Sequence, residues 1–146
     1  MRGFSIKFYQ RVSLLLAALF AVVGAIFLLL PQRTVKFFNA LSQLLGMAPA
    51  PVTGLNFFLI LAVGYMYAVT VLAVLMARQP RNPVLPLLLA HAKIASSLLS
   101  FGFFLFHLPS LIYLANGIVD GAIGILALCF YLRLKKLSTA GRIESE

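Results

Sequence analysis

The chain has 146 residues, of which 62% are hydrophobic and 10% are charged, and its mean hydropathy is +1.04. Soluble domains carry about 25% charged residues, so this composition excludes a soluble protein and indicates an integral membrane protein. The formal net charge of +9 does not indicate a nucleic-acid partner, because the basic residues lie at the ends of apolar runs and not on one amphipathic face. We expect the lipid bilayer to be the main partner.

Four apolar runs follow one another along the chain, at about residues 12–30, 57–76, 84–106 and 111–132. A helix rises ~1.5 Å per residue, so each run is long enough to cross a hydrocarbon core of ~30 Å. The remaining residues suffice for short connections only. The sequence therefore predicts an all-α integral membrane four-helix bundle, built as a single transmembrane domain over residues 1–146.

The ends of two runs carry clear signals. The first run follows Arg2, Lys7 and Arg11 and ends in Leu-Leu-Leu-Pro without a small-residue cleavage site, which indicates a retained signal anchor and not a cleaved signal peptide. The third run begins after Asn82, a favourable helix N-cap, and Pro83, whose missing N–H costs nothing at the first helical position.

Basic residues are distributed unequally between the two ends of the predicted bundle. Arg33 and Lys36 lie at one end. The other end carries the remaining basic residues that flank the runs, namely Arg2, Lys7, Arg11, Arg78, Arg81, Arg133, Lys135, Lys136 and Arg142. Because cytoplasmic loops carry the excess of Lys and Arg, we predict a multi-pass protein of the plasma (inner) membrane with both termini in the cytoplasm.

The segment Thr34–Gly46, between the first two runs, has a helical apolar arc opposite a polar one. The apolar arc comprises Phe37, Phe38, Leu41, Leu44 and Leu45, and the polar arc comprises Lys36, Asn39, Ser42 and Gln43. This pattern predicts an interfacial amphipathic helix that lies flat on the outer leaflet. A helix that covers the end of the bundle needs the same apolar stripe, so both placements remain open.

Lys93 and Asp120 are the only charged residues well inside the apolar runs. An ionisable side chain at bilayer depth costs roughly 2.5–3.5 kcal/mol on insertion scales, so such residues face a bundle interior and often pair. Their depths in the third and fourth runs differ by about one helical turn, which a lysine stem can span. We therefore predict a direct ion pair between antiparallel neighbouring helices.

Further polar residues share the helix faces of these two charges. Ser96, Ser97 and Ser100 follow Lys93 at helical spacing, and Asn116 precedes Asp120 by four residues. Tyr65, Tyr67 and Thr70, in the second run, offer further hydroxyls, although packed aromatic rings are our first expectation for the two tyrosines. The predicted intramembrane polar centre thus comprises Lys93, Asp120, Asn116, Ser97, Ser100 and Tyr67.

Small residues accompany this polar face. Gly117, Gly124 and Ala127 lie on the side of Asp120, and the first run repeats the pattern with alanines at positions 17, 21 and 25. Small residues at such spacing let membrane helices approach closely. We therefore expect tight helix contacts on several faces.

No catalytic, metal or cofactor motif stands out in the sequence. His91 and His107 lie about four turns apart on one predicted helix, whereas haem ligation by a bundle needs histidines that face each other at similar depth. We predict no cofactor, no metal site and no catalytic residues.

The four-span layout, with Arg11 before the first span, Pro31 after it, Lys93 in the third span and Asn116 with Asp120 in the fourth, resembles DoxX-like bacterial membrane proteins. The resemblance covers the architecture of the whole chain and not a sequence motif, and the Gly- and Lys-bearing segment common after the first span of that family is absent here. It implies a bacterial plasma-membrane protein, sometimes an accessory to quinone-linked redox enzymes.

Three functions fit these observations. The first is a small accessory or structural subunit that docks a larger membrane partner or forms a homo-oligomer, with Lys93 and Asp120 fixing helix register. The second is a carrier for a small ion or lipophilic molecule, in which Asp120 titrates at mid-membrane depth while Lys93 and Asn116 tune it. The third is a membrane-embedded enzyme on a lipophilic substrate, with Asp120 as acid or base. The structural role of the pair is our first expectation, because a pair that neutralises itself needs no further purpose.

Overall fold

The computed structural model describes residues 5–52 and 56–143, and this part of the chain is all-helical. The helices are α1 (Ile6–Leu29), α2 (Pro31–Leu44), α3 (Asn56–Arg78), α4 (Val84–Phe106) and α5 (Leu111–Ile143). All except α2 are long and apolar enough to cross a membrane. The predicted multi-pass helical architecture is therefore confirmed at this level.

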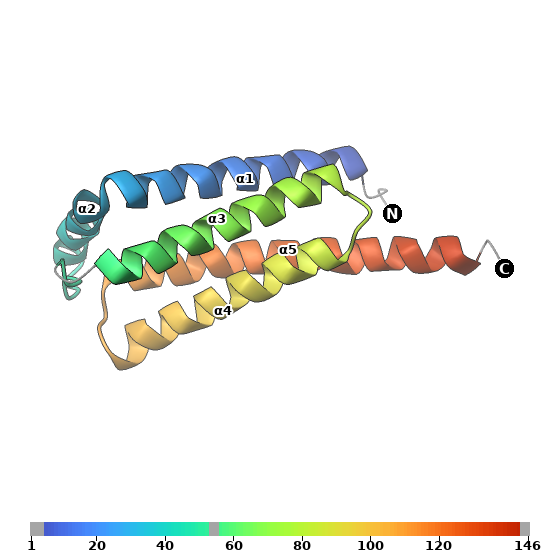
Figure 1. The fold of residues 1–146 in the computed structure, drawn as a ribbon. Coiled ribbons are helices and arrows are strands. Elements are labelled where there is room, and N and C mark those ends of the chain that lie inside the picture. Colours follow the sequence, from blue (N-terminus) through green and yellow to red (C-terminus); the bar gives the residue numbers. More distant parts are fainter. Residues whose placement is uncertain (1–4, 53–55, 144–146) are drawn as a thin grey trace.

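The four long helices associate as two pairs. Figure 1 shows α1 beside α3 and α4 beside α5, and these two pairings make the most extensive contacts in the bundle. α1 begins and α5 ends at the same end of the bundle, and α2 crosses the opposite end (Figure 1). We call the half of the bundle with the first turns of α1 and α4 the terminal half, and the half covered by α2 the α2 half.

Local sequence explains where the long helices begin and end. α4 has the predicted bounds: Asn82 Oδ1 accepts a hydrogen bond from the Val84 backbone N–H (3.1 Å), and Pro83 already has helical dihedral angles (φ −73°, ψ −17°). α1 begins at Ile6, earlier than predicted, because Ser5 Oγ accepts from the Phe8 N–H (3.4 Å) and caps the helix. α5 continues past the predicted end at Leu132, since Arg, Leu and Lys residues that favour helix follow.

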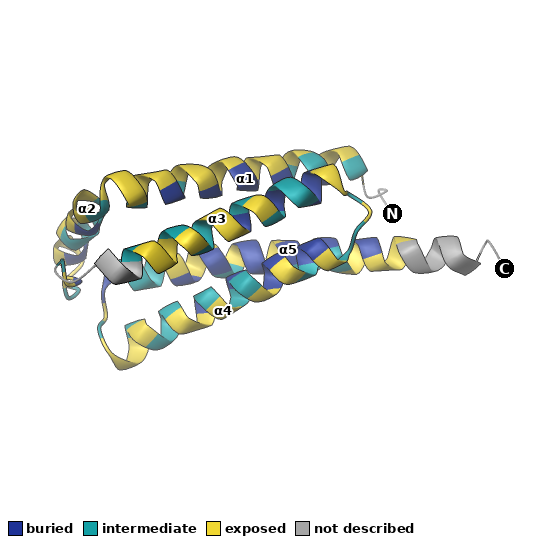
Figure 2. Cartoon of the chain, viewed as in Figure 1, coloured by how far each residue is buried: buried dark blue, intermediate teal, exposed yellow. Residues whose placement is uncertain are grey.

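Buried residues are concentrated in the terminal half (Figure 2). No described residue from Leu59 to Ala68 on α3, or from Leu98 to Phe106 on α4, is buried. The core of the terminal half draws on all four long helices: Tyr9, Leu16, Phe20, Val69, Ala73, Met76, Leu89, Ala127, Phe130 and Leu134. The rings of Tyr9 and Phe130 join α1 to α5 there, edge to face, at 4.9 Å between centroids.

The short helix α2 closes the other end. It begins at Pro31, three residues before the predicted start, because proline is well suited to the first helical position. Val35 and Ser42 are buried, and Ser42 Oγ accepts a hydrogen bond from the Leu111 N–H at the start of α5 (3.2 Å). Asn39 bonds both backbone groups of Ala50, at 2.8 and 2.7 Å. One side of α2 is thus attached to the bundle, as expected for a helix that covers its end.

Candidate functional site

An ion pair lies where the terminal half meets the α2 half. Lys93 Nζ on α4 donates to Asp120 Oδ1 on α5 at 2.8 Å. Lys93 is 2% exposed and Asp120 is 4% exposed. The predicted direct contact between these two charges is therefore present, and each charge is neutralised inside the bundle.

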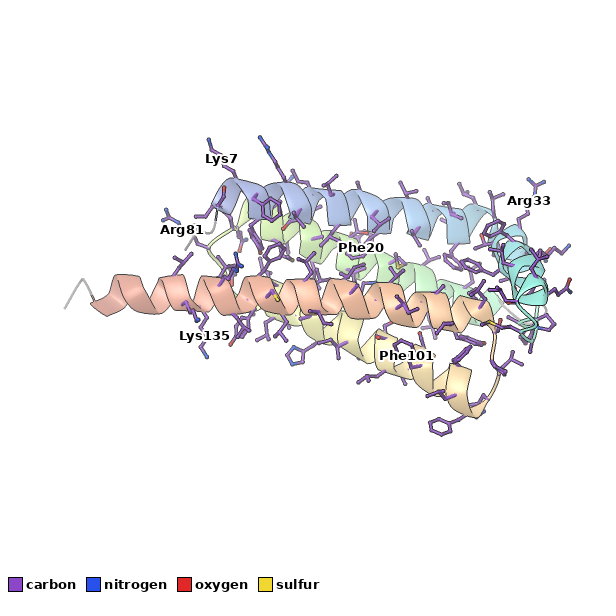
Figure 3. The ribbon with its side chains drawn as sticks, turned by 180° about the vertical axis from the view of Figure 1, so that it is seen from behind. Lys7, Phe20, Arg33, Arg81, Phe101 and Lys135 are labelled. Carbon is purple, nitrogen blue, oxygen red and sulfur yellow. The ribbon has the colours of Figure 1, made fainter. Side chains whose placement is uncertain are left out.

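Two aromatic rings complete the surroundings of the lysine ammonium. Lys93 Nζ lies 4.5 Å from the centroid of the Phe20 ring on α1 and 5.1 Å from that of Tyr65 on α3. Figure 3 shows Phe20 between α1 and the neighbouring helices. Both distances are within the range of cation–π attraction, so both rings attract the lysine ammonium. The Tyr65 hydroxyl donates to the Ala92 carbonyl oxygen at 3.0 Å, which fixes this ring against α4.

Glycines on α5 allow α4 to approach closely enough for the pair to form. A Cβ atom at Gly121 would lie 2.9 Å from Ser97 Oγ, and one at Gly124 would lie 2.8 Å from Ile94 Cγ1. Real Cβ atoms do not make contacts this short, so a larger residue requires a shift of the Ser97 or Ile94 side chain or of α4 itself. The small face predicted from the sequence is thus used inside the bundle, along α4.

Hydroxyl and amide groups extend the polar centre along the same seam towards α2. Ser97 Oγ donates to the Gly117 carbonyl oxygen at 2.7 Å. Asn116 Nδ2 donates to Ser100 Oγ at 2.7 Å and lies 3.4 Å from Ser96 Oγ. Of the predicted members, Lys93, Asp120, Asn116, Ser97 and Ser100 therefore meet on one seam between two helices.

Tyr67 does not join this centre, since its side chain is 72% exposed on α3. Tyr65, two residues earlier and hence on the opposite side of the helix, takes the place assigned to it. The sequence contained a usable signal: Tyr65, Val69, Ala73 and Met76 follow one another at spacings of three and four, and the last three are buried. Tyr67 lies off this stripe.

A cavity of about 270 Å³ lies beside the ion pair. Its polar lining comes from Lys93, Asp120, Ser96 and Asn116, and its aromatic lining includes Phe20 and Tyr65. The rest of the wall is apolar and comes from Leu19, Val23, Phe27, Ala62, Met66, Val119 and Ile123. The space is thus apolar on most sides, with one charged, neutralised pair in its wall.

The two histidines lie outside the polar centre. Both are exposed, and His91 Nδ1 is 2.8 Å from the Leu87 carbonyl oxygen of its own helix. Among the described residues, no three His, Cys, Asp or Glu side chains are grouped so that they could hold a metal ion.

Charged residues mark the two ends of the bundle. Lys7, Arg81 and Lys135 lie at the terminal end, and Arg33 lies at the α2 end (Figure 3). The long apolar stretches of the four helices separate these ends. Comparison of the chain with models of known protein families, with curated proteins and with solved structures finds no match.

Proposed function

We propose that this protein is a small, non-catalytic accessory subunit that docks a larger partner within the plasma membrane. The observation that carries the proposal is an unfilled small face on α3. Gly64 and Ala68, four residues apart, are both exposed, and a Cβ atom at Gly64 would meet no described atom within 4 Å. Small residues at this spacing let a second membrane helix approach closely. The similar face on α5 is already covered by α4, whereas the α3 face is open to a partner.

The docking proposal is tested with the Gly64→Leu variant of the full-length protein, extracted in a mild detergent and analysed by native mass spectrometry. The mass of the wild-type complex should include a different membrane protein, and this partner should be absent from the Gly64→Leu sample. Gly102→Leu is the matched control, because a Cβ at Gly102 on α4 also meets nothing within 4 Å. A complex that survives Gly64→Leu, or one that contains only copies of this chain, contradicts the proposal.

The same proposal includes an orientation. The basic residues at the terminal end support a cytoplasmic location of both termini under the positive-inside rule. In this orientation α2 lies at the outer interface, with the exposed ring of Phe37 in the acyl boundary. In a Cys129→Ser background, Gln43→Cys should react with an impermeant thiol reagent from the outside only. Reaction from the cytoplasmic side alone would invert the orientation.

A second candidate function is that of a carrier for a small lipophilic molecule, with Lys93 and Asp120 as its site. The cavity favours it, because both charged side chains contribute to the cavity wall. The double variant Lys93→Met with Asp120→Leu separates the two functions. A variant that folds and still docks its partner, but loses transport, assigns the pair to a carrier.

Kinship with DoxX-like proteins also remains a proposal. It is supported by the four-span layout and by the meeting of Lys93, Asn116 and Asp120 on one seam.

A further inference from the structure

We infer that the cavity beside Lys93 and Asp120 is a binding site for an uncharged lipid alcohol, whose hydroxyl group donates a hydrogen bond to Asp120. This inference goes beyond the docking role. It also names a ligand class for the carrier candidate. Only the transport of this ligand rests on the carrier function; its binding does not.

The free carboxylate oxygen supplies the first step. Asp120 Oδ1 accepts from Lys93 Nζ, whereas Asp120 Oδ2 makes no hydrogen bond with any residue that the structure describes. Asp120 lines the cavity and is 4% exposed overall. Protein atoms do not fully enclose this oxygen, so it remains accessible from the cavity and can accept a hydrogen bond from a ligand O–H or N–H group.

The ion pair in the cavity wall has no net charge, because Lys93 and Asp120 neutralise each other at 2.8 Å. Because the pair is neutral as a whole, a charged ligand head would gain little net attraction from it and would still lose its own hydration on entering the cavity. An uncharged head that can donate a hydrogen bond avoids this cost.

Outside the polar centre, the cavity walls are apolar or aromatic. The cavity volume of about 270 Å³ is close to the lower end of the range for small-molecule sites, roughly 300–1,000 Å³. A neighbouring hollow of about 190 Å³ shares Phe27 and Ala62 with the cavity and continues under α2 to Val35 and Pro31. An alkyl tail can therefore extend from the ion pair towards α2.

The entry follows from which wall residues are exposed. Leu19 on α1, Ala62 on α3, and Asn116 and Val119 on α5 line the cavity, and all four also lie on the exposed surface. The cavity therefore opens onto the outer surface of these helices. Exposed apolar side chains on membrane-crossing helices face lipid, so the ligand enters sideways from the bilayer.

The test uses three photoreactive probes with the same diazirine-bearing chain and different ends: dodecanol, dodecanoic acid and dodecane. The full-length protein in phosphatidylcholine vesicles is irradiated with each probe, at a pH where the acid is ionised, and the labelled peptides are identified. The alcohol should label the segments around Phe27, Ala62 and Val119 at least about tenfold more than the other two probes, as expected for one hydrogen bond to a charged group. Unlabelled dodecanol should compete, and dodecanoic acid should not.

Two alanines provide matched variants. Ala62→Phe on α3 fills the cavity, because Ala62 lines it, whereas Ala122→Phe on α5 adds the same bulk at an exposed position that is not part of the wall. Alcohol labelling should fall about tenfold in Ala62→Phe and remain unchanged in Ala122→Phe. Equal labelling by all three probes, or labelling that survives Ala62→Phe, overturns the inference. If the alcohol binds but is not transported, the binding site is retained and only the carrier function is excluded. Loss of docking in Gly64→Leu bears on neither the binding site nor the carrier function.

Discussion

The two halves of the bundle hold their helices together by different means. In the terminal half, large side chains such as Met76, Leu89 and Phe130 are buried and pack across all four long helices. In the α2 half, long stretches of α3 and α4 contain no buried residue, and hydrogen bonds such as those of Asn39 and Ser42 make the connections. Packing thus stabilises one half, and the other half keeps open space.

The ion pair lies at the boundary between the terminal half and the α2 half. The pair touches the aromatic ring of Phe20, which belongs to the core, and it lines the cavity together with this ring. A site that must be rigid on one side and accessible on the other is well placed there. The buried pair is thus in contact with the packed half and borders the open space of the other half.

Loss of one partner of the pair should have the largest effect on this boundary. Lys93→Met leaves Asp120 buried without its counter-ion, and we expect a loss of about 3–5 kcal/mol in unfolding free energy. The double variant Lys93→Met with Asp120→Leu should recover most of that loss. Thermal or denaturant unfolding of the two single variants and the double gives the coupling energy. Purely additive losses would mean that the pair contributes no coupling.

Truncation of one leucine in each half should sharpen the comparison. Leu89→Ala removes a fully buried side chain of α4 in the terminal half and should cost roughly 2–5 kcal/mol. Leu99→Ala, on the same helix in the α2 half, removes an exposed side chain and should cost less than about 0.5 kcal/mol. Unfolding of both variants in the same detergent measures the difference. Equal losses would show that the packing of the two halves is alike.

Overpacking of the α4–α5 contact should have an intermediate effect. Gly124→Ala places a Cβ atom 2.8 Å from Ile94 Cγ1 and 3.2 Å from the Ile94 backbone nitrogen, so the Ile94 side chain or α4 must shift, at a cost of about 1–3 kcal/mol. Gly102→Ala meets open space on α4 and should be neutral or slightly stabilising, because alanine favours helix. The readout is the midpoint of thermal unfolding. A neutral Gly124→Ala would mean that the two helices separate easily.

The smallest effect is expected at the α2 attachment. Ser42→Ala removes the acceptor for the Leu111 N–H and should cost about 1 kcal/mol, with faster amide hydrogen exchange at the start of α5. Thr34→Ala is the control on the same helix, because the Thr34 hydroxyl bonds only to the Leu30 carbonyl oxygen one turn earlier. Exchange that rises equally in both variants would indicate that α2 is held by other contacts.

Much of this architecture can be predicted from the sequence, because membrane helices must satisfy their own backbone hydrogen bonds and must therefore be long and apolar. The bounds of α4 and the contact between Lys93 and Asp120 follow from local signals and from the cost of buried charge. The α3 tyrosine that contacts the Lys93 ammonium is harder to predict, since both Tyr65 and Tyr67 are plausible until the buried face of α3 is known. The cavity could not be predicted, because it depends on how far two helix pairs separate, which no local pattern encodes.

Both charges of the site belong to the α4–α5 hairpin, and this has a consequence for biosynthesis. A hairpin that enters the membrane with one unpaired lysine and one unpaired aspartate meets the full insertion penalty twice. Here only the short connection 107–110 separates the helices that carry Lys93 and Asp120. The two side chains can therefore neutralise each other as the hairpin leaves the translocation machinery. The aromatic rings of α1 and α3 then need only enclose a pair that has already formed.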